Sequence, residues 1–91
     1  MSSLNQEILA SELKNLKNRF FLDNAIEKKF VFKNFVEALG FILKLGIIAE
    51  KANHHPEIFN VYNKITIRLT THDANGVTMK DINLAIQIDL L

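Results

Sequence analysis

The chain lacks cysteine altogether and has only one proline among its 91 residues. Without cysteine it can form neither a disulfide framework nor a thiolate metal site, and this composition suits a reducing compartment. A strong charge of one sign is also absent, because the formal net charge is +1. So small a bias gives no basis for attraction to nucleic acid or to an anionic membrane. We therefore expect a cytoplasmic protein that does not bind nucleic acid directly.

A long, uninterrupted apolar run is missing as well. The most apolar stretch, residues 35–49, contains Glu37 and Lys44. It is also shorter than the roughly 20 residues that a membrane-spanning helix needs, so we expect no membrane insertion. Hydrophobic residues make up 48% of the chain and charged residues 23%, which is typical of a globular protein rather than a disordered one. The length predicts a single domain covering residues 1–91.

Three segments have the residue pattern of a helix. The first lies within residues 5–18 and carries leucines at i, i+4 and i+7. The second, residues 35–52, follows the cap residue Asn34 and is apolar around more than the roughly 100° stripe of a surface helix. The third follows Thr78, with Asp81 at the third helical position as in a capping box. The width of the second helix's apolar surface favours packing on a sheet and on a further helix or subunit.

Between the helices, two regions predict β-strands. A turn-prone Asp-Asn pair separates two apolar runs, which predicts a hairpin with strands at 19–22 and 26–32. From residue 61 to 72 apolar and polar residues alternate, which predicts a long strand, continuous or bent into two, with one polar face. Tyr62 and His72 are expected on that polar face.

The order of these elements, α-β-β-α-β-β-α, predicts an α+β fold with two layers. We expect a four-stranded antiparallel sheet with three helices packed on one face.

All three histidines lie around one turn and the strand that follows it. His54 and His55 directly precede Pro56, which disfavours helix at the residue before it, so the second helix should end just before the pair. Histidine has an unperturbed pKa near 6.5 and exchanges protons at neutral pH, so the cluster indicates an acid–base site or a metal site. Adjacent side chains in an extended turn diverge, and a helical His pair at i and i+4 is absent. We therefore favour acid–base chemistry and expect no metal.

Each of the other polar residues near the cluster has two possible interpretations, one functional and one structural. Glu50 precedes His54 by four residues and could orient a histidine, or it could be an ordinary solvated helix residue. Tyr62 could face a ligand or serve only in packing. Asp81 is better explained as a helix cap than as an acid in the chemistry.

The spacing of Glu50, His54-His55-Pro56, Tyr62, His72 and Asp81 resembles the signature of the pterin-4a-carbinolamine dehydratases. The match covers most of the chain, from about residue 4 to residue 89. Four short segments carry it: His54-His55-Pro56-Glu57, Phe59-Asn60-Val61-Tyr62-Asn63-Lys64, Thr71-His72-Asp73 and Asp81-Ile82-Asn83-Leu84-Ala85.

The resemblance implies a hydro-lyase that converts 4a-hydroxytetrahydrobiopterin, or a related pterin, into the quinonoid dihydropterin and requires no metal or redox cofactor. Members of the family thereby recycle the pterin cofactor of aromatic amino acid hydroxylases. The resemblance makes His54 and His72 the leading acid–base candidates and gives His55 a supporting catalytic role. It also implies a set of substrate-binding positions: Glu50, Asn53, Pro56, Ile58, Tyr62, Thr70 and Thr71.

The chain departs from the common family pattern at several of these positions. Asn53 stands where many members carry aspartate, Ile58 where an aromatic residue is common, and Thr70 where a serine is often found. The change at Ile58 removes a ring that could stack on the pterin, so substrate affinity is the property most affected.

The resemblance also implies a homodimer with a sheet continuous across the interface, or a homotetramer formed through the second helices. Two alternatives remain open. One is a non-enzymatic binding module, since some animal members are dimerisation cofactors of a homeodomain transcription factor. The other is a diverged relative that acts elsewhere in pterin or molybdopterin metabolism.

Overall fold

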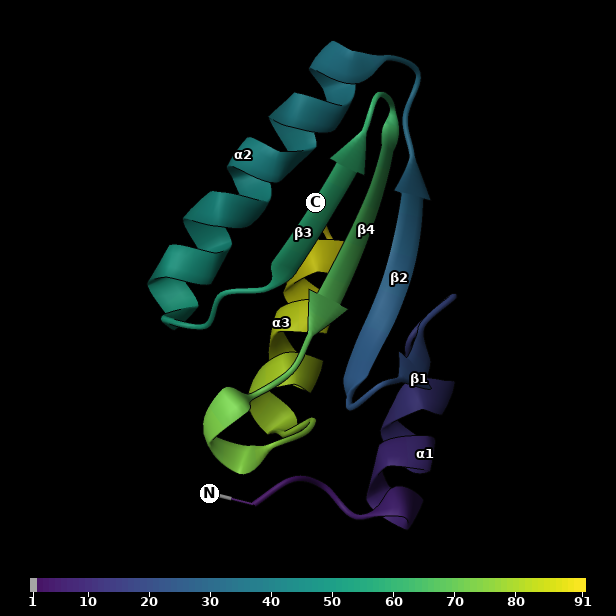
Figure 1. Ribbon diagram of the computed structural model, residues 1–91, viewed down its shortest axis with the longest axis vertical. Helices are drawn as coiled ribbons and strands as arrows, with labels where there is room; N and C mark the ends of the chain where they lie inside the picture. Colours follow the sequence, from purple (N-terminus) through teal and green to yellow (C-terminus); the bar gives the residue numbers. More distant parts are fainter. Residues whose placement is uncertain (1) are drawn as a thin grey trace.

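The computed structural model describes residues 2–91 and contains three α-helices and one four-stranded antiparallel sheet (Figure 1). The elements in chain order are α1 (Gln6–Lys14), β1 (Phe20–Leu22), β2 (Ala25–Val31), α2 (Phe35–Ala52), β3 (Glu57–Val61), β4 (Lys64–Leu69), the 3-10 turn η1 (His72–Ala74) and α3 (Met79–Asp89). The strands are ordered β1-β2-β4-β3 across the sheet. The predicted α+β class and the order α-β-β-α-β-β-α are confirmed.

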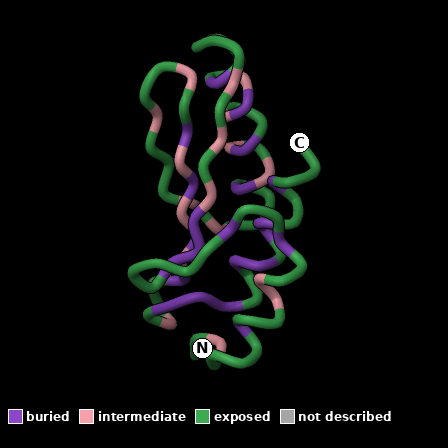
Figure 2. Tube along the Cα trace, turned by 90° about the vertical axis from the view of Figure 1, so that its right-hand side faces the viewer, coloured by how far each residue is buried: buried purple, intermediate pink, exposed green. Residues whose placement is uncertain are grey.

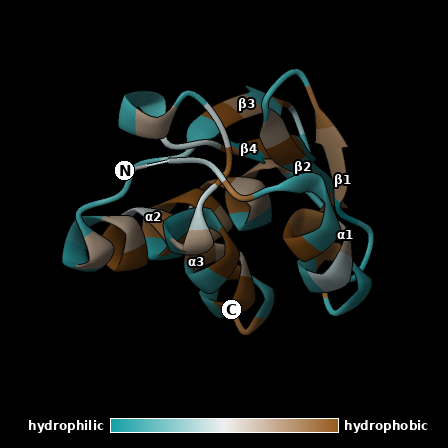
Figure 3. Cartoon of the chain, turned by 90° about the horizontal axis from the view of Figure 1, so that it is seen from below, coloured by the Kyte–Doolittle hydropathy of each residue, from teal (hydrophilic) through white to brown (hydrophobic). Residues whose placement is uncertain are grey.

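The core lies between the sheet and the helices, which Figure 3 shows together below the strands. Ile26 of β2 pairs with Leu69 of β4, and Ile65 and Ile67 continue the same buried face. Buried positions recur at intervals along strands and helices, as an amphipathic pattern requires (Figure 2). The helices contribute a matching set of buried side chains: Leu9, Ala38, Phe41, Leu45, Ala49, Ile82, Ala85 and Ile88.

Helix α2 has the bounds that its sequence predicts. The side chain of Asn34 accepts a hydrogen bond from the N–H of Glu37 at 2.9 Å and so caps the first turn. At the other end Asn53 adopts the left-handed conformation, with φ 49°, and the N–H of His54 donates to the carbonyl of Ala49 at 3.1 Å. This termination, together with Pro56, releases His54 and His55 from the helix at the end of the sheet.

Helix α1 is shorter than expected, because it ends at Lys14 rather than near residue 18. Asn15 closes its last turn and Asn18 takes a positive φ of 58°, which turns the chain toward β1. Leu16, the last leucine of the predicted stripe, is still buried. The hairpin strands lie within one residue of their predicted ends.

Of the two alternatives for residues 61–72, a continuous strand is wrong and a pair of strands is correct, but the bounds of the pair differ from the prediction. The chain forms two strands, β3 and β4, joined by a turn at Tyr62, which has a φ of 53°. Val61 was expected on the apolar face, but it lies in β3 and is 75% exposed. His72 lies in η1 beyond the end of β4, because the ladder with β2 stops at Leu69.

Within residues 2–91, no helix combines the length and the apolar character that crossing a membrane requires.

Candidate active site

The three histidines lie at one pocket. It has a volume of about 350 Å³ and lies where α2 ends and β4 leads through η1 toward α3, at the lower end of the sheet in Figure 1. The lining residues are Asn53, His54, His55, Thr70, Thr71, His72, Asp73 and Lys80. The structure therefore brings together residues from two connecting segments and from the first turn of α3, which are separate in the sequence.

A buried carboxylate holds His54. Nε2 of His54 lies 2.5 Å from Oδ1 of Asp81, whose side chain has no exposed surface. The His54 side chain is itself 12% exposed. With Nε2 held by Asp81, the orientation of the ring is fixed, and within residues 2–91 its Nδ1 has no hydrogen-bond partner.

Asp81 performs this task while it also caps α3. Its Oδ2 accepts hydrogen bonds from the N–H of Thr78 at 2.9 Å and from the hydroxyl of Thr71 at 2.8 Å. The two threonine hydroxyls are themselves 2.8 Å apart. The predicted capping box is present, and its carboxylate connects α3, the segment after β4 and the segment after α2. Sequence reasoning identified the cap but missed the bond to His54, since only the family spacing linked the two positions.

His55 and His72 are in wetter surroundings than His54. Nε2 of His55 bonds to Oε1 of Glu50, and both side chains are mostly exposed. An exposed pair of this kind contributes little to stability. His72 is exposed on η1 and lines the same pocket. The site thus holds one nearly buried, oriented imidazole and two that are open to solvent.

Four of the seven predicted substrate-binding residues lie at this site. Asn53, Thr70 and Thr71 line the pocket, and Glu50 reaches it through His55. The hydroxyl of Thr70 donates to the carbonyl of Asn24 at 2.7 Å, so it also fixes the β1–β2 turn.

The remaining three residues are not part of the pocket lining. Pro56 directly precedes β3, and Ile58 is the second residue of that strand. Tyr62 lies in the turn between β3 and β4, at the opposite end of the sheet from η1 (Figure 1). Contact of these three residues with substrate stays a prediction.

Two pocket residues had not been predicted as catalytic or substrate-binding residues. Asp73 directly follows His72, and Lys80 is the second residue of α3. Asp73 belongs to the Thr71-His72-Asp73 segment of the family pattern, whereas no pattern in the sequence pointed to Lys80. Across residues 2–91, no three or more His, Asp or Glu side chains are grouped closely enough to hold a metal ion.

Comparison with known proteins gives a consistent result over the full chain. The family model described as Pterin 4 alpha carbinolamine dehydratase matches residues 2–91. Two curated relatives carry the provisional name pterin-4-alpha-carbinolamine dehydratase. The one from Sulfurisphaera tokodaii is 43% identical over 91 residues, covering 100% of this chain and 98% of the relative. The one from Prochlorococcus marinus strain MIT 9313 is 44% identical over 88 residues, covering 97% of this chain and 92% of the relative.

A solved structure is also similar. The protein from Brucella melitensis, described as a transcriptional coactivator/pterin dehydratase, superposes with a TM-score of 0.94 at 37% identity. The match covers 98% of this chain and 97% of that one.

Proposed function

The chain belongs to the pterin-4a-carbinolamine dehydratase family, and on that premise we propose that it dehydrates a 4a-hydroxytetrahydropterin. In this reaction the C4a–O bond breaks, the oxygen takes up a proton and leaves as water, and N5 loses a proton. The product is the quinonoid dihydropterin. The observation that most supports the proposal is the convergence of His54, His55 and His72 on one polar pocket.

His54 and His72 are the proposed acid–base pair. Protonating the leaving hydroxyl and removing the N5 proton are both general acid–base steps near neutral pH, and histidine is the usual agent. His54 is held by Asp81 with its Nδ1 edge free for substrate, while His72 lines the same pocket from η1. The two stereoisomers at C4a present the hydroxyl to opposite faces of the ring, so the two histidines exchange roles between them. Asp81 acts through His54 and is a positioning residue.

The family membership supports the proposed substrate class. A 4a-hydroxytetrahydropterin is the by-product of aromatic amino acid hydroxylases, so the proposed reaction returns that cofactor to a form that a reductase can recycle. The direct test is the rate at which chemically generated 4a-hydroxytetrahydropterin loses water with and without the protein. A folded protein that gives no acceleration would remove the basis for this proposal.

We expect His55 and Glu50 to contribute much less than His54. Glu50→Gln should lower kcat/KM by less than about fivefold, because an exposed ion pair is worth roughly 0–1 kcal/mol. Steady-state kinetics on this variant beside wild type measure the effect. A loss as large as that of a His54 variant would instead give Glu50 a direct part in the chemistry.

An apolar stripe on α2 supports a proposal about assembly. Val36, Leu43 and Ile47 are 77%, 69% and 58% exposed and follow one another at i, i+7 and i+11 on one side of the helix. Exposed apolar side chains gathered on one helix face are typical of an interface. We propose that the α2 stripe of a second copy covers this stripe where two dimers pair into a homotetramer, as the family resemblance implies.

The assembly has its own test. Leu43→Glu is expected to lower the molecular mass measured by sedimentation at micromolar concentration, because the buried contact would then contain an unpaired carboxylate. Lys44→Glu, a charge change at the neighbouring exposed position, should leave the mass unchanged. A wild-type protein that sediments as a monomer would contradict the proposal.

The same stripe carries the second candidate function, a binding module without catalysis. The Brucella melitensis protein is described in part as a transcriptional coactivator, and an apolar helix face suits a protein partner. Such a module would keep its partner after substitution of the pocket histidines, whereas an enzyme would lose turnover.

A further inference from the structure

We propose that the N-terminal strap, residues 3–4, is a positioning element for His72, and that Ser3 is the reason why residue 76 is a glycine. His72 lies in the site loop, residues 71–77, between β4 and α3. The inference rests on the proposed role of His72 in dehydration and adds to it residues that hold this histidine in place.

The site loop is closed on itself and anchored on one side. Thr71 and Gly76 form an isolated antiparallel bridge, with distances of 2.9 and 3.3 Å between the donor nitrogens and the acceptor oxygens. Within it the N–H of Asn75 donates to the carbonyl of His72 at 3.0 Å. The hydroxyl of Thr71 is held by Asp81, which fixes the first residue of the loop. Position and orientation of the His72 backbone therefore depend on where the bridge lies.

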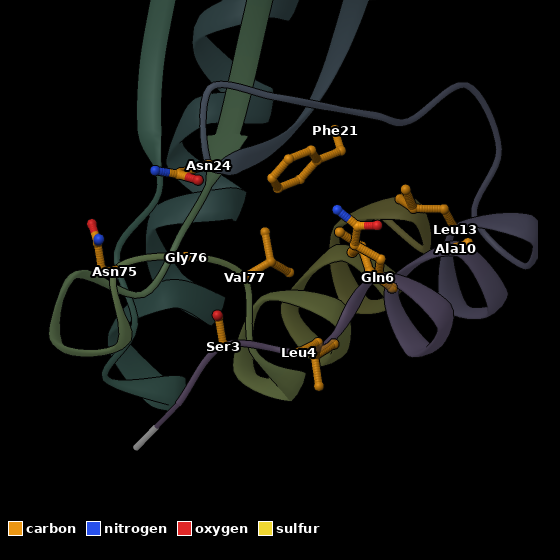
Figure 4. A pocket seen from close by; sticks show the side chains of 11 residues that line it. Ser3, Leu4, Gln6, Ala10, Leu13, Phe21, Asn24, Asn75, Gly76 and Val77 are labelled. Atoms are coloured by element: carbon orange, nitrogen blue, oxygen red, sulfur yellow. The ribbon is translucent and has the colours of Figure 1, made fainter.

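The strap anchors the other side of the loop. The N–H of Leu4 donates to the carbonyl of Val77 at 2.8 Å, and the Leu4 side chain packs partly buried against the core. Figure 4 shows Ser3 and Leu4 on the segment that passes alongside Gly76 and Val77. Val77 is 2% exposed, so the last residue of the loop is fixed between the core and the strap.

The contact between strap and loop is too close for any side chain at position 76. A Cβ added there would lie 2.9 Å from Cβ and 3.4 Å from Oγ of Ser3. The Ser3 Cβ is bonded to the backbone, so no change of rotamer can move it away. The backbone conformation does not itself require glycine, because no glycine within residues 2–91 has a positive φ. The absence of a side chain at Gly76 is therefore explained by Ser3 rather than by backbone strain.

The strap is not packed on all sides. It borders a pocket of about 450 Å³ that α1, β1 and the site loop also line, with Ala10, Leu13 and Phe21 among the lining residues (Figure 4). A methyl group at position 76 should thus displace the strap and break the Leu4–Val77 hydrogen bond without opening the core. The site loop then loses one of its two anchors, and His72 loses its fixed position.

The test is a cycle of Gly76→Ala, Ser3→Gly and the double variant. Gly76→Ala is expected to lower kcat by about tenfold, because displacement of a reacting group by less than 1 Å already has effects of this order. Ser3→Gly removes both atoms that would clash, so the double variant should regain most of the lost kcat. Gly40→Ala is the matched control, since a Cβ there has no atom within 4 Å, and its kcat should stay at the wild-type value.

Two readouts do not depend on the reaction. The amide of Leu4 should lose protection from hydrogen exchange in Gly76→Ala and regain it in the double variant. The imidazole NMR resonances of His72 should shift and return in the same way. These signals distinguish failure of the dehydratase proposal from failure of the strap proposal. A wild-type protein without dehydratase activity would contradict the dehydratase proposal, while the amide and imidazole signals would still report on the strap. An unchanged Leu4 amide and His72 ring in Gly76→Ala, or a double variant as impaired as the single one, would overturn the inference.

Discussion

Substitution of His54 by glutamine is expected to lower kcat for dehydration by about 10²–10⁴-fold, the usual contribution of a general acid–base group. Glutamine can still donate a hydrogen bond to Asp81 from near the position of Nε2, but it cannot exchange a proton with substrate. His72→Ala is expected to lower kcat by a similar factor, because alanine cannot exchange a proton with substrate either. Because His72 is exposed, its removal should hardly change the free energy of unfolding.

His54→Ala provides the comparison that separates chemistry from stability. It leaves Oδ1 of the buried Asp81 without its partner, which costs about 1–3 kcal/mol of stability. His54→Gln should therefore be as inactive as His54→Ala but closer to wild type in thermal unfolding. If His54→Gln keeps most of the wild-type kcat, His54 does not transfer a proton in the reaction.

Substitution of Asp81 should have the largest effect on stability. Asp81→Ala removes the acceptor of the Thr78 N–H, the Thr71 hydroxyl and the His54 ring. The loss of a helix cap and of the acceptor for buried donors should together lower the free energy of unfolding by about 3 kcal/mol. For a domain of this size, that lowers the midpoint of thermal unfolding by roughly 12–24 °C.

Asp81→Asn tests the positioning role without leaving a cavity. If its amide oxygen continues to accept from Thr78 and Thr71, its NH2 group faces Nε2 of His54 and favours the tautomer with the proton on Nδ1. We expect kcat to fall by roughly 10²-fold or more, as in other sites where an Asp-to-Asn change reverses a histidine tautomer.

Another helix cap serves as the control for the Asp81 variants. Asn34→Ala removes the cap of α2, far along the chain from the pocket, and should cost about 1 kcal/mol with kcat unchanged. If Asp81→Asn lowers stability but leaves kcat at the wild-type value, then Asp81 is a cap and nothing more.

The sequence was most informative where the signal is local. The caps Asn34 and Thr78, the apolar periodicity of α2 and the effect of Pro56 on the preceding residue each act over a few positions. Asn34, the periodicity and Pro56 together define α2 from its first residue to its last, and Thr78 marks the start of α3. The clustering of the histidines was likewise visible, because His54 and His55 are adjacent.

The details that sequence reasoning missed depend on unusual backbone conformations or on distant contacts. Tyr62 adopts a positive φ, although tyrosine, unlike asparagine, does not favour that conformation. The turn between β3 and β4 therefore left no clear signal in the sequence. The bond between His54 and Asp81 joins positions 27 residues apart, and Lys80 reaches the pocket only because α3 starts beside it. Periodicity and capping rules carry no information about such contacts.

The most direct test of the dehydratase proposal is the dehydration of chemically generated 4a-hydroxytetrahydropterin, followed by absorbance, with wild type beside His54→Gln and His72→Ala. We expect wild type to accelerate the loss of water well above the uncatalysed rate, and both variants to lose most of that acceleration while remaining folded. A folded wild-type protein that leaves the uncatalysed rate unchanged would contradict the proposal. The exposed stripe on α2, and a protein partner that binds it, would then be the next subject of experiment.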